Sequence, residues 1–485
     1  MGIIKLYSVY FLFAINYFVQ CRLNMKPCLA TIGKTMSIRY KYEGGKGEYI
    51  DSYYSRTLCK PGKFPTLTDD INSKVCVIGG GMAGVATLHS LVEKGEKPVL
   101  IEANRIGWGA SGRNGGFVSS GYSQDPRKIV KRVGESHAKE LLGLTTDAMG
   151  IINRRIGGQG KKLKENIPGL FDVSWFNEPG EVEKNVEFLN DLMGVNYEFW
   201  PKEKFRDYYH SKHYYDAFLK PDGLQLHSLN YTRHSARTAE KGGARVFEKS
   251  PALDISKMTN GWKIFTKNGS VTADEVVICC SAYIGSLNFR LSNATLPVAT
   301  YIMLTEPIGE RLKDVMKGKW GVSDNRFSSN YYRTFDDTSL FWGGRVSMFN
   351  PGGKKLEKIM KNDLFKVYPQ LRGVKTAVAW GGFMGYPVHK MPQIGQLEPG
   401  FWYAQGFGGS GMTSTIAGGE IISDAIVNGD ERYKLFEPYG LDYAGKPFGP
   451  IVAQAAYWLF QLQDAYKEGR LNDYLSCFIN PRKYF

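Results

Sequence analysis

Hydrophobic and polar positions change their period near residue 75, where a continuous apolar run gives way to a helical pattern. The run Val75 to Ile78 predicts a buried parallel strand. From Ala83 to about Lys94, apolar side chains recur at helical spacing, and Gly95 ends the pattern. Pro98 to Ile101 is a second apolar run. This order predicts a strand–helix–strand unit on a parallel sheet.

The turn between the first strand and the helix is rich in glycine. Its sequence, GGGMAG, allows the backbone to approach a pyrophosphate at the N-terminus of the helix. Glu102 follows the second strand, where a carboxylate can accept both hydroxyls of an adenosine ribose and disfavours a 2′-phosphate. We therefore predict a dinucleotide site, and expect no NADP, at Gly79, Gly81, Met82, Ala83, Gly84 and Glu102.

A second glycine-rich loop, IGWGASGRNGGF, follows directly at Ile106 to Phe117. An enzyme that binds a nicotinamide dinucleotide does not need a second glycine-rich loop at this position. An isoalloxazine ring, by contrast, must be held by backbone groups while one face stays open to substrate. The second loop therefore favours FAD over NAD. Its expected cofactor contacts are Ala110 and Ser111 along the pyrophosphate and ribityl chain, Asn114, Gly115 and Gly116 beside the ring, and Arg113, which either meets phosphate or flavin charge or is solvated.

Taken together, these segments resemble the D-amino-acid-oxidase-like superfamily of FAD-dependent oxidoreductases. The segment SYYSRT, Ser52 to Thr57, makes the chain similar to the gamma-glutamylputrescine oxidase branch. The stretch that begins at Gly223 resembles the return of the chain to the FAD domain and implies an adenine contact near Ala252. The stretch FWYAQGFGGSGMTS from Phe401 resembles the strand, turn and helix that close over the flavin. It implies contacts from Gly409, Ser410, Gly411, Met412 and Thr413.

The resemblance implies an α/β fold with a discontinuous Rossmann-like FAD-binding domain and a mixed-sheet α+β substrate domain. The expected FAD-binding segments are residues 46–125, 222–290 and 378–430, and the expected substrate segments are 126–221 and 291–377. Residues 1–45 are expected to be a targeting or disordered extension, and residues 431–485 a C-terminal helical tail.

The implied reaction is oxidation of a C–N bond: hydride passes to flavin N5, the imine hydrolyses, and O2 is reduced to H2O2. Tyr331, Tyr332 and Arg333 resemble pocket-lining positions, although the tyrosines are equally well explained as packing aromatics. Amino-acid oxidases of the superfamily typically carry a carboxylate-binding arginine where this chain has Met384. An amine, such as a polyamine derivative or a secondary amine, is therefore the expected substrate.

Other functions remain open at this stage. They are an amino-acid oxidase or dehydrogenase for glycine, sarcosine or a D-amino acid, and an RNA-modifying flavoprotein. The net charge of +15 permits RNA binding, but the 62 basic residues are dispersed, so no nucleic-acid partner is expected. His227 and His389 are expected to be structural. The seven scattered cysteines predict neither a disulfide framework nor a metal site. The second loop contains no histidine and Phe383 to Met391 contains no cysteine, so FAD is expected to be non-covalent.

The N-terminal segment is basic and contains no Asp or Glu from Met1 to Tyr42, which is typical of transit peptides. Its apolar run, Leu6 to Val19, is shorter than the roughly 20 residues of a membrane span, so no stable membrane insertion is expected. Three interpretations remain: a mitochondrial presequence, a plastid-type signal, or initiation at Met25 or Met36, which would leave a cytoplasmic protein.

Overall fold

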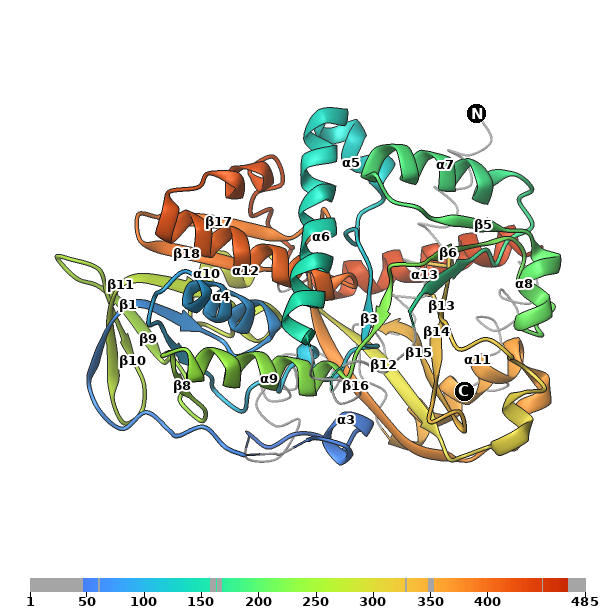
Figure 1. Ribbon diagram of the computed structural model, residues 1–485, viewed down its shortest axis with the longest axis horizontal. Helices are drawn as coiled ribbons and strands as arrows, with labels where there is room; N and C mark the ends of the chain where they lie inside the picture. Colours follow the sequence, from blue (N-terminus) through green and yellow to red (C-terminus); the bar gives the residue numbers. More distant parts are fainter. Residues whose placement is uncertain are drawn as a thin grey trace, which may run out of the picture. The chain divides into compact units, whose positions relative to one another are not determined.

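The computed structural model describes residues 47–59, 62–157, 163, 168–327, 329–347, 353–446 and 448–469. The predicted N-terminal extension, with Met25, Met36 and the run Leu6 to Val19, lies outside these residues, and so does the end of the predicted tail, 470–485. From Asp51 onward the chain forms one unit, built on two eight-stranded sheets (Figure 1). Every helix within the described ranges is too short or too polar to cross a membrane.

The first sheet contains the predicted strand–helix–strand unit at its centre. β1 (Ile71–Ile78) pairs in parallel with β2 (Val99–Ile101) on one side and with β11 (Ser270–Ile278) on the other. α4 (Met82–Glu93) connects β1 to β2. The remaining strands are β8 (Arg245–Phe247), β18 (Phe401–Gln405), β17 (Gln393–Glu398), β10 (Trp262–Phe265) and β9 (Asp254–Lys257).

Both faces of β1 are buried, which explains its continuous apolar sequence. Val75 and Val77 pack in the core beneath four helices, whereas Cys76 and Ile78 belong to a second core on the opposite face, with Trp262 of β10. The four helices cover one face of the sheet (Figure 1): α4, α6 (Glu135–Ile156), α9 (Ser228–Lys241) and α12 (Gly411–Asn428).

The second sheet is mixed. Its strand order is β16-β12-β15-β14-β13-β4-β6-β5, with one parallel pair, β13 and β4, among antiparallel neighbours. The bounds are β16 (Thr376–Tyr386), β12 (Leu296–Thr305), β15 (Ser339–Ser347), β14 (Tyr331–Phe335), β13 (Gly321–Asp324), β4 (Leu170–Val173), β6 (Ala217–Lys220) and β5 (Glu198–Trp200).

The predicted FAD-binding segment 378–430 begins within β16, which belongs to the second sheet. There β16 pairs with β12 from Leu296 opposite Tyr386 to Thr305 opposite Thr376. The turn after Tyr386, rather than residue 378, returns the chain to β17 of the first sheet.

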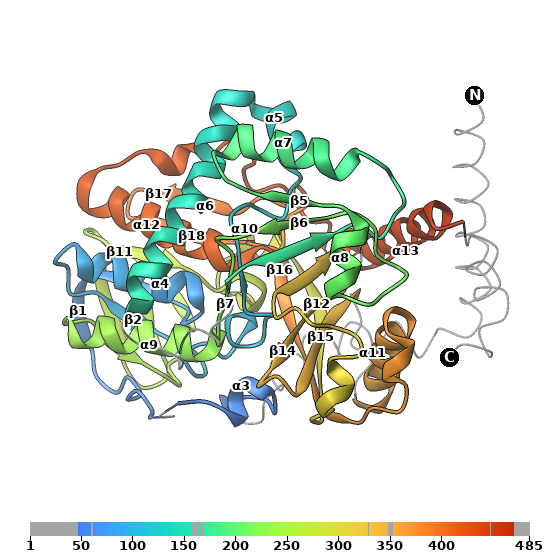
Figure 2. The same cartoon turned by 45° about the vertical axis from the view of Figure 1, so that its right-hand side comes forward.

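The remaining elements connect or cover the two sheets (Figure 2). β3 (Phe117–Val118) and β7 (Leu224–Gln225) form a two-stranded ladder. The helices are α3 (Tyr53–Arg56), α5 (Pro126–Val133), α7 (Glu181–Met193), α8 (Lys202–Tyr208), α10 (Phe289–Asn293), α11 (Gly353–Val367) and α13 (Gly449–Lys467). Short 3₁₀ helices include η2 (Ala110–Gly112), η4 (Ser281–Tyr283) and η7 (Arg432–Phe436).

Candidate active site

The first glycine loop closes tightly on its own backbone and on the neighbouring strand. A Cβ added to Gly84 would lie 2.0 Å from the Gly79 carbonyl oxygen. Gly79 itself has a φ of +108°, and a Cβ there would lie 2.9 Å from the Cys279 carbonyl oxygen. Gly80 was not among the predicted cofactor contacts. A Cβ on Gly80 would lie 2.5 Å from Ile106 Cδ1. Side chains are therefore excluded from the loop that leads into α4.

The N-terminus of α4 opens at this loop. Its N-cap residue is Gly81, which has no side chain to cap the helix, so the first N–H groups must find acceptors elsewhere. One of them, the Met82 N–H, donates to Ser111 Oγ at 2.7 Å. Ser111 belongs to η2 in the second glycine loop. The two loops thus meet at the end of the helix that carries partial positive charge.

Glu102 lies at the tip of β2, as predicted. Its two carboxylate oxygens accept the Gly80 N–H at 2.6 Å and the Asn104 N–H at 2.7 Å. Burial raises the pKa of Glu102 despite these two hydrogen bonds. A carboxylate offers about four lone pairs, so each oxygen can still accept a hydroxyl group.

A buried ionic cluster near Glu102 was not predicted. Glu248, directly after β8, accepts hydrogen bonds from Arg233 Nη1 at 2.8 Å and from the Ile106 N–H at 2.8 Å, and Arg105 Nε lies 3.4 Å away. The cluster fixes the start of the second glycine loop against the end of β8. Ala252, the predicted adenine contact, is half-buried a few residues further along the chain.

The second glycine loop is folded on itself by Asn114. The Asn114 Nδ2 group donates to the carbonyl oxygens of Ala110 and Ser111, both at 3.2 Å, and Asn114 Oδ1 accepts the Gly116 N–H at 2.8 Å. The asparagine therefore holds the backbone of the loop.

Arg113 is not the solvated arginine that the sequence left as an alternative, because it is buried and contacts the backbone of the protein. Its Nε–H donates to the Trp108 carbonyl oxygen at 2.8 Å, and its Nη1 group to the Gly381 carbonyl oxygen at 3.4 Å. The guanidinium also lies over the Trp108 ring, 4.4 Å from its centroid. Arg113 is buried, and it links the second loop to β16.

Side chains from the second sheet lie close to the glycines of the second loop. A Cβ on Gly115 would lie 2.9 Å from Tyr331 Cε2, and a Cβ on Gly343 of β15 would lie 2.0 Å from the same atom. The Tyr331 ring is therefore held between the loop and β15. Tyr331 therefore lies at the border between the second loop and the second sheet.

Tyr332 packs as a core aromatic residue, which is one of the two alternatives that the sequence left open. Adjacent residues of a strand point to opposite faces, and Tyr332 points away from the glycine loop. It is fully buried, stacks on Trp342 with ring centroids 4.9 Å apart, and shares a hydrogen bond of 2.8 Å with the Tyr368 hydroxyl.

Arg333 is buried beside the second loop, and its role as a pocket residue stays a prediction. Its Nη2 group donates to the Tyr54 hydroxyl at 3.1 Å and to the Leu226 carbonyl oxygen at 3.3 Å. A Cβ on Gly116, whose φ is +73°, would lie 2.8 Å from Arg333 Nη2. Tyr54 comes from α3, so the SYYSRT segment supports this loop from the second-sheet side.

The C-terminal loop, Gly408 to Thr413, leads into α12. The Ser410 N–H donates to Ser123 Oγ at 3.0 Å, and Thr413 Oγ1 donates to the Ser119 carbonyl oxygen at 2.8 Å. No atom lies within 4 Å of a Cβ built on Gly411. Ser410, the N-cap of α12, makes no side-chain capping bond, so the first N–H groups of a second helix face this region. The sequence analysis did not find Ser119 and Ser123, because neither is part of a glycine motif.

The model of the family described as FAD dependent oxidoreductase, DAO, matches residues 74–425. The chain belongs to this family. It is 31% identical to the gamma-glutamylputrescine oxidoreductase of Escherichia coli strain K12, over 80% of this chain and 92% of that protein. It is 28% identical to the probable oxidoreductase OrdL of Haemophilus influenzae, over 87% of this chain and 98% of the relative. Glycine oxidase from Bacillus cereus has a similar fold, with a TM-score of 0.60 and 20% identity, over 75% and 97% of the two chains.

The chain is therefore an FAD-dependent oxidoreductase, and its predicted α/β fold is confirmed. Its own residues fit the cofactor. The glycines of the first loop keep side chains away from the start of α4, Glu102 has spare acceptor capacity, and neither α4 nor α12 has a side-chain cap at its N-terminus.

Met384 of the oxidoreductase lies on the face of β16 that carries Trp380 and Gly382, because alternate residues of a regular strand share a face. Trp380 Nε1 donates to the Arg113 carbonyl oxygen at 3.0 Å, and a Cβ on Gly382 would lie 3.3 Å from Arg113 Cβ. This face of β16 is therefore directed toward the second glycine loop.

The two histidines singled out in the sequence make local hydrogen bonds in the oxidoreductase. His227 Nδ1 accepts the Asn230 N–H at 3.1 Å and so caps α9, and burial lowers the pKa of His227 to about 3. His389 Nδ1 accepts the Met391 N–H at 3.1 Å, and burial lowers its pKa. Both rings are therefore neutral near pH 7.

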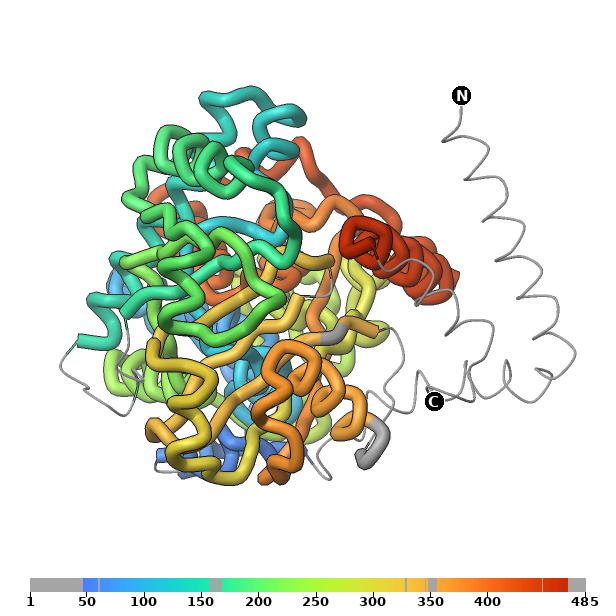
Figure 3. The backbone as a smooth tube through the Cα atoms, turned by 90° about the vertical axis from the view of Figure 1, so that its right-hand side faces the viewer, coloured from blue at the N-terminus to red at the C-terminus, as the bar shows by residue number. Residues whose placement is uncertain are grey.

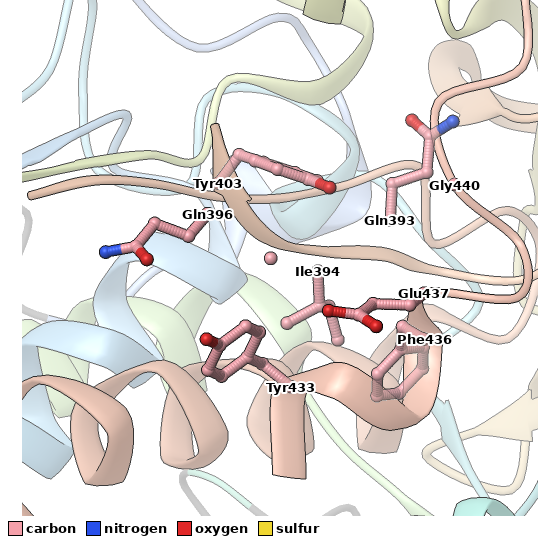
Figure 4. Close-up of a pocket in the computed structure, with 9 residues that line it drawn as sticks. Gln393, Ile394, Gln396, Tyr403, Tyr433, Phe436, Glu437 and Gly440 are labelled. Atoms are coloured by element: carbon pink, nitrogen blue, oxygen red, sulfur yellow. The ribbon is translucent and has the colours of Figure 1, made fainter. Parts of the chain in front are cut away.

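A small cavity of about 60 Å³ lies away from the glycine loops, between β17 and η7 (Figure 4). Its lining includes Gln396, Tyr403, Tyr433 and Glu437. The volume holds only a few water molecules, and none of the predicted cofactor or substrate residues lines it.

Proposed function

We propose that this oxidoreductase oxidises the C–N bond of an amine whose reacting carbon carries no carboxylate, such as a polyamine derivative or a secondary amine. O2 is the proposed acceptor and H2O2 the product. Bound non-covalently, FAD supplies the two-electron step by taking a hydride from the carbon next to nitrogen. The proposal is supported by the 31% identity to a gamma-glutamylputrescine oxidoreductase.

In this proposal the chain's own groups orient and hold the reactants. Glu102 accepts the ribose hydroxyls, and the first loop with the N-terminus of α4 receives the pyrophosphate. Asn114, Gly115 and Gly116 hold the ring edge. The amides of Ser410 to Thr413 stabilise negative charge that develops on the cofactor. Tyr331 borders the place where the substrate amine enters.

The observation that carries the substrate class is Met384. Its thioether is on the strand face directed toward the second loop, at the position where we expect an arginine in amino-acid oxidases of the superfamily. A methionine cannot form the bidentate, charge-assisted pair that an α-carboxylate requires. An amine without an α-carboxylate loses no ion pair at this position, and the Met384 side chain gives it an apolar contact.

The test is anaerobic bleaching of the bound flavin by putrescine, gamma-glutamylputrescine, sarcosine, glycine and D-alanine, followed by peroxide measurement when air is readmitted. We expect bleaching by the putrescine compounds and little by the amino acids. Met384→Arg should reduce the second-order rate with the putrescine compounds by at least tenfold, because it places a partly buried cation beside the cationic substrate. Met384→Leu is the matched control and should stay within about threefold of the parent.

Bleaching by glycine, sarcosine or D-alanine alone would contradict the amine proposal and would mean that another residue binds the carboxylate. Fast dye reduction with slow peroxide formation would contradict the assignment of O2 as the acceptor.

A further inference from the structure

The C-terminal helix α13 is polar on the side that faces the protein. The Tyr457 hydroxyl accepts the Val346 N–H at 3.3 Å, and Asp464 Oδ2 accepts the Phe327 N–H at 3.1 Å. Just beyond the helix, Glu468 Oε1 accepts the Trp175 Nε1–H at 2.6 Å. Gln454 and Tyr457 are buried. Hydrogen bonds, rather than apolar packing alone, therefore attach α13 to the second-sheet region.

The outward side of α13 is apolar, the reverse of an ordinary surface helix. Val452, Leu459 and Tyr466 expose 66%, 46% and 71% of their surface, and Phe448, the N-cap, exposes 69%. Trp458 flanks this stripe and is also exposed. Figure 3 shows α13, in red, on the flank of the molecule. A helix with apolar groups on its solvent side is stable in water only when another surface covers that side.

The spacing of the exposed residues indicates what covers them. Val452, Leu459 and Tyr466 are seven residues apart, and Ala455 and Leu462 repeat at the same interval between them. These are the a and d positions of a heptad repeat, the pattern that packs one helix against another helix. The repeat continues through the whole length of α13.

We propose that the outward face of α13 is a dimer interface, occupied by α13 of a second copy of this chain across a two-fold axis. The exposed parts of Phe448, Trp458 and Tyr466 amount to nearly two whole aromatic side chains, or roughly 350 Å² per copy. With Val452 and Leu459 included on both copies, the buried total approaches the roughly 1,000 Å² that a specific interface requires. Aromatic enrichment and the absence of charge on the stripe are also typical of interface cores.

The charges of α13 argue against a lipid surface as the occupant. A helix that lies on a membrane carries several Lys or Arg residues on its polar side. The charged residues of α13 are Asp464 and Lys467 alone. Asp464 bonds to the Phe327 N–H, and Lys467 Nζ lies 3.0 Å from Glu178 Oε1, so the helix has no basic side to meet acidic headgroups.

The test is the solution mass of the full-length holoenzyme, measured by light scattering during gel filtration at several concentrations. We expect a dimer for the parent chain. Leu459→Glu places a charge at the centre of the stripe in each copy, and it should raise the dimer dissociation constant at least 100-fold. Val452→Lys is a second variant with the opposite charge. Its agreement with Leu459→Glu excludes an effect of misfolding in one variant.

Phe289→Glu is the matched control, because Phe289 is an 82% exposed aromatic residue in α10, outside the stripe. It should leave the mass unchanged. All three variants should keep the flavin absorption spectrum of the parent. A monomeric parent chain would overturn the proposal, as would a dimer that survives both stripe variants. If a monomeric parent chain floats with phosphatidylcholine–phosphatidylglycerol vesicles, the face binds lipid instead.

Discussion

The two glycine-rich loops, only about twenty residues apart, are held by different parts of the molecule. The first loop is enclosed by its own backbone and by neighbours at the strand ends of the first sheet, namely Gly79, Glu102 and Cys279. The second loop is enclosed largely by groups from distant segments: Tyr283 against Gly109, Tyr331 against Gly115, and Arg333 with Tyr54 against Gly116.

The two glycine loops therefore depend on different parts of the fold for their shape. The first loop contacts the adjacent strands of the first sheet, together with Ile106 and Ser111 of the second loop. The second loop contacts side chains of the second sheet and of α3. The shape of the second loop is therefore tied to the sheet that carries the proposed substrate residues.

The largest expected effect is that of Gly84→Ala. The new methyl group would lie 2.0 Å from the Gly79 carbonyl oxygen, and no side-chain movement can relieve a clash with backbone. We expect FAD affinity to fall at least 100-fold, or about 3 kcal/mol, measured by titrating apoprotein with FAD. Gly143→Ala in α6, where no atom lies within 4 Å of the added Cβ, should leave the affinity unchanged. Normal affinity in Gly84→Ala would show that this loop is not the pyrophosphate site.

An intermediate effect is expected from Gly115→Ala, because its methyl group would meet the Tyr331 side chain at 2.9 Å rather than backbone. We expect FAD binding to weaken by about tenfold, or roughly 1.4 kcal/mol. In a Tyr331→Ala background, the same substitution should cost less than about twofold, because the clashing ring is absent. A double-mutant cycle with FAD titration measures this coupling. Additive losses would contradict the idea that Tyr331 shapes the loop.

A pH dependence of the free energy of unfolding, rather than a change in FAD affinity, is expected next to the second loop. His227 has a pKa of about 3 when folded, against 6.5 when unfolded, and its neighbour Leu226 donates its N–H to the Gly116 carbonyl oxygen. The unfolded state therefore binds the proton first. The stability due to neutral His227 is complete above pH 6.5 and is lost as the pH falls toward 3. By pH 5 the loss is about 2 kcal/mol.

Urea unfolding at pH 7.5 and pH 5 measures this effect. His227→Gln should lose about 2 kcal/mol less than the parent chain between these two pH values. His89→Gln is the comparison variant, because His89 has a similarly lowered pKa of about 4 but lies in α4, away from the second loop. An unchanged pH dependence in His227→Gln would mean that this histidine is not the group that titrates.

The sequence predicted best what depends on neighbouring residues. β1, the glycine turn, α4 and Glu102 follow one another within about thirty residues, and each is signalled by its own local pattern. The same holds for the turn before α12. At these positions, residues that are close in the sequence explain why a glycine is required.

The sequence could not determine a side chain's direction where that direction depends on distant partners. It left Arg113 and Tyr332 between two roles; strand alternation turns Tyr332 toward Tyr368, and Arg333 reaches Tyr54, 279 residues away in the sequence. Ser123 and Glu248 belong to no motif, and the motif that contains Tyr54 does not indicate its contact with Arg333. Only the folded structure shows that these residues lie next to the glycine loops.

The pairing of β1 with β11 has a consequence for synthesis of the protein. Ile71 pairs with Val271, so 200 residues must leave the ribosome before the central strand of the first sheet gains its second neighbour. β18, beside β11, arrives later still. Until then, β1 has one unsatisfied edge and two apolar faces, which is the kind of segment that chaperones protect from aggregation. We therefore expect the nascent chain to depend on chaperones through most of translation and to acquire FAD only after its release.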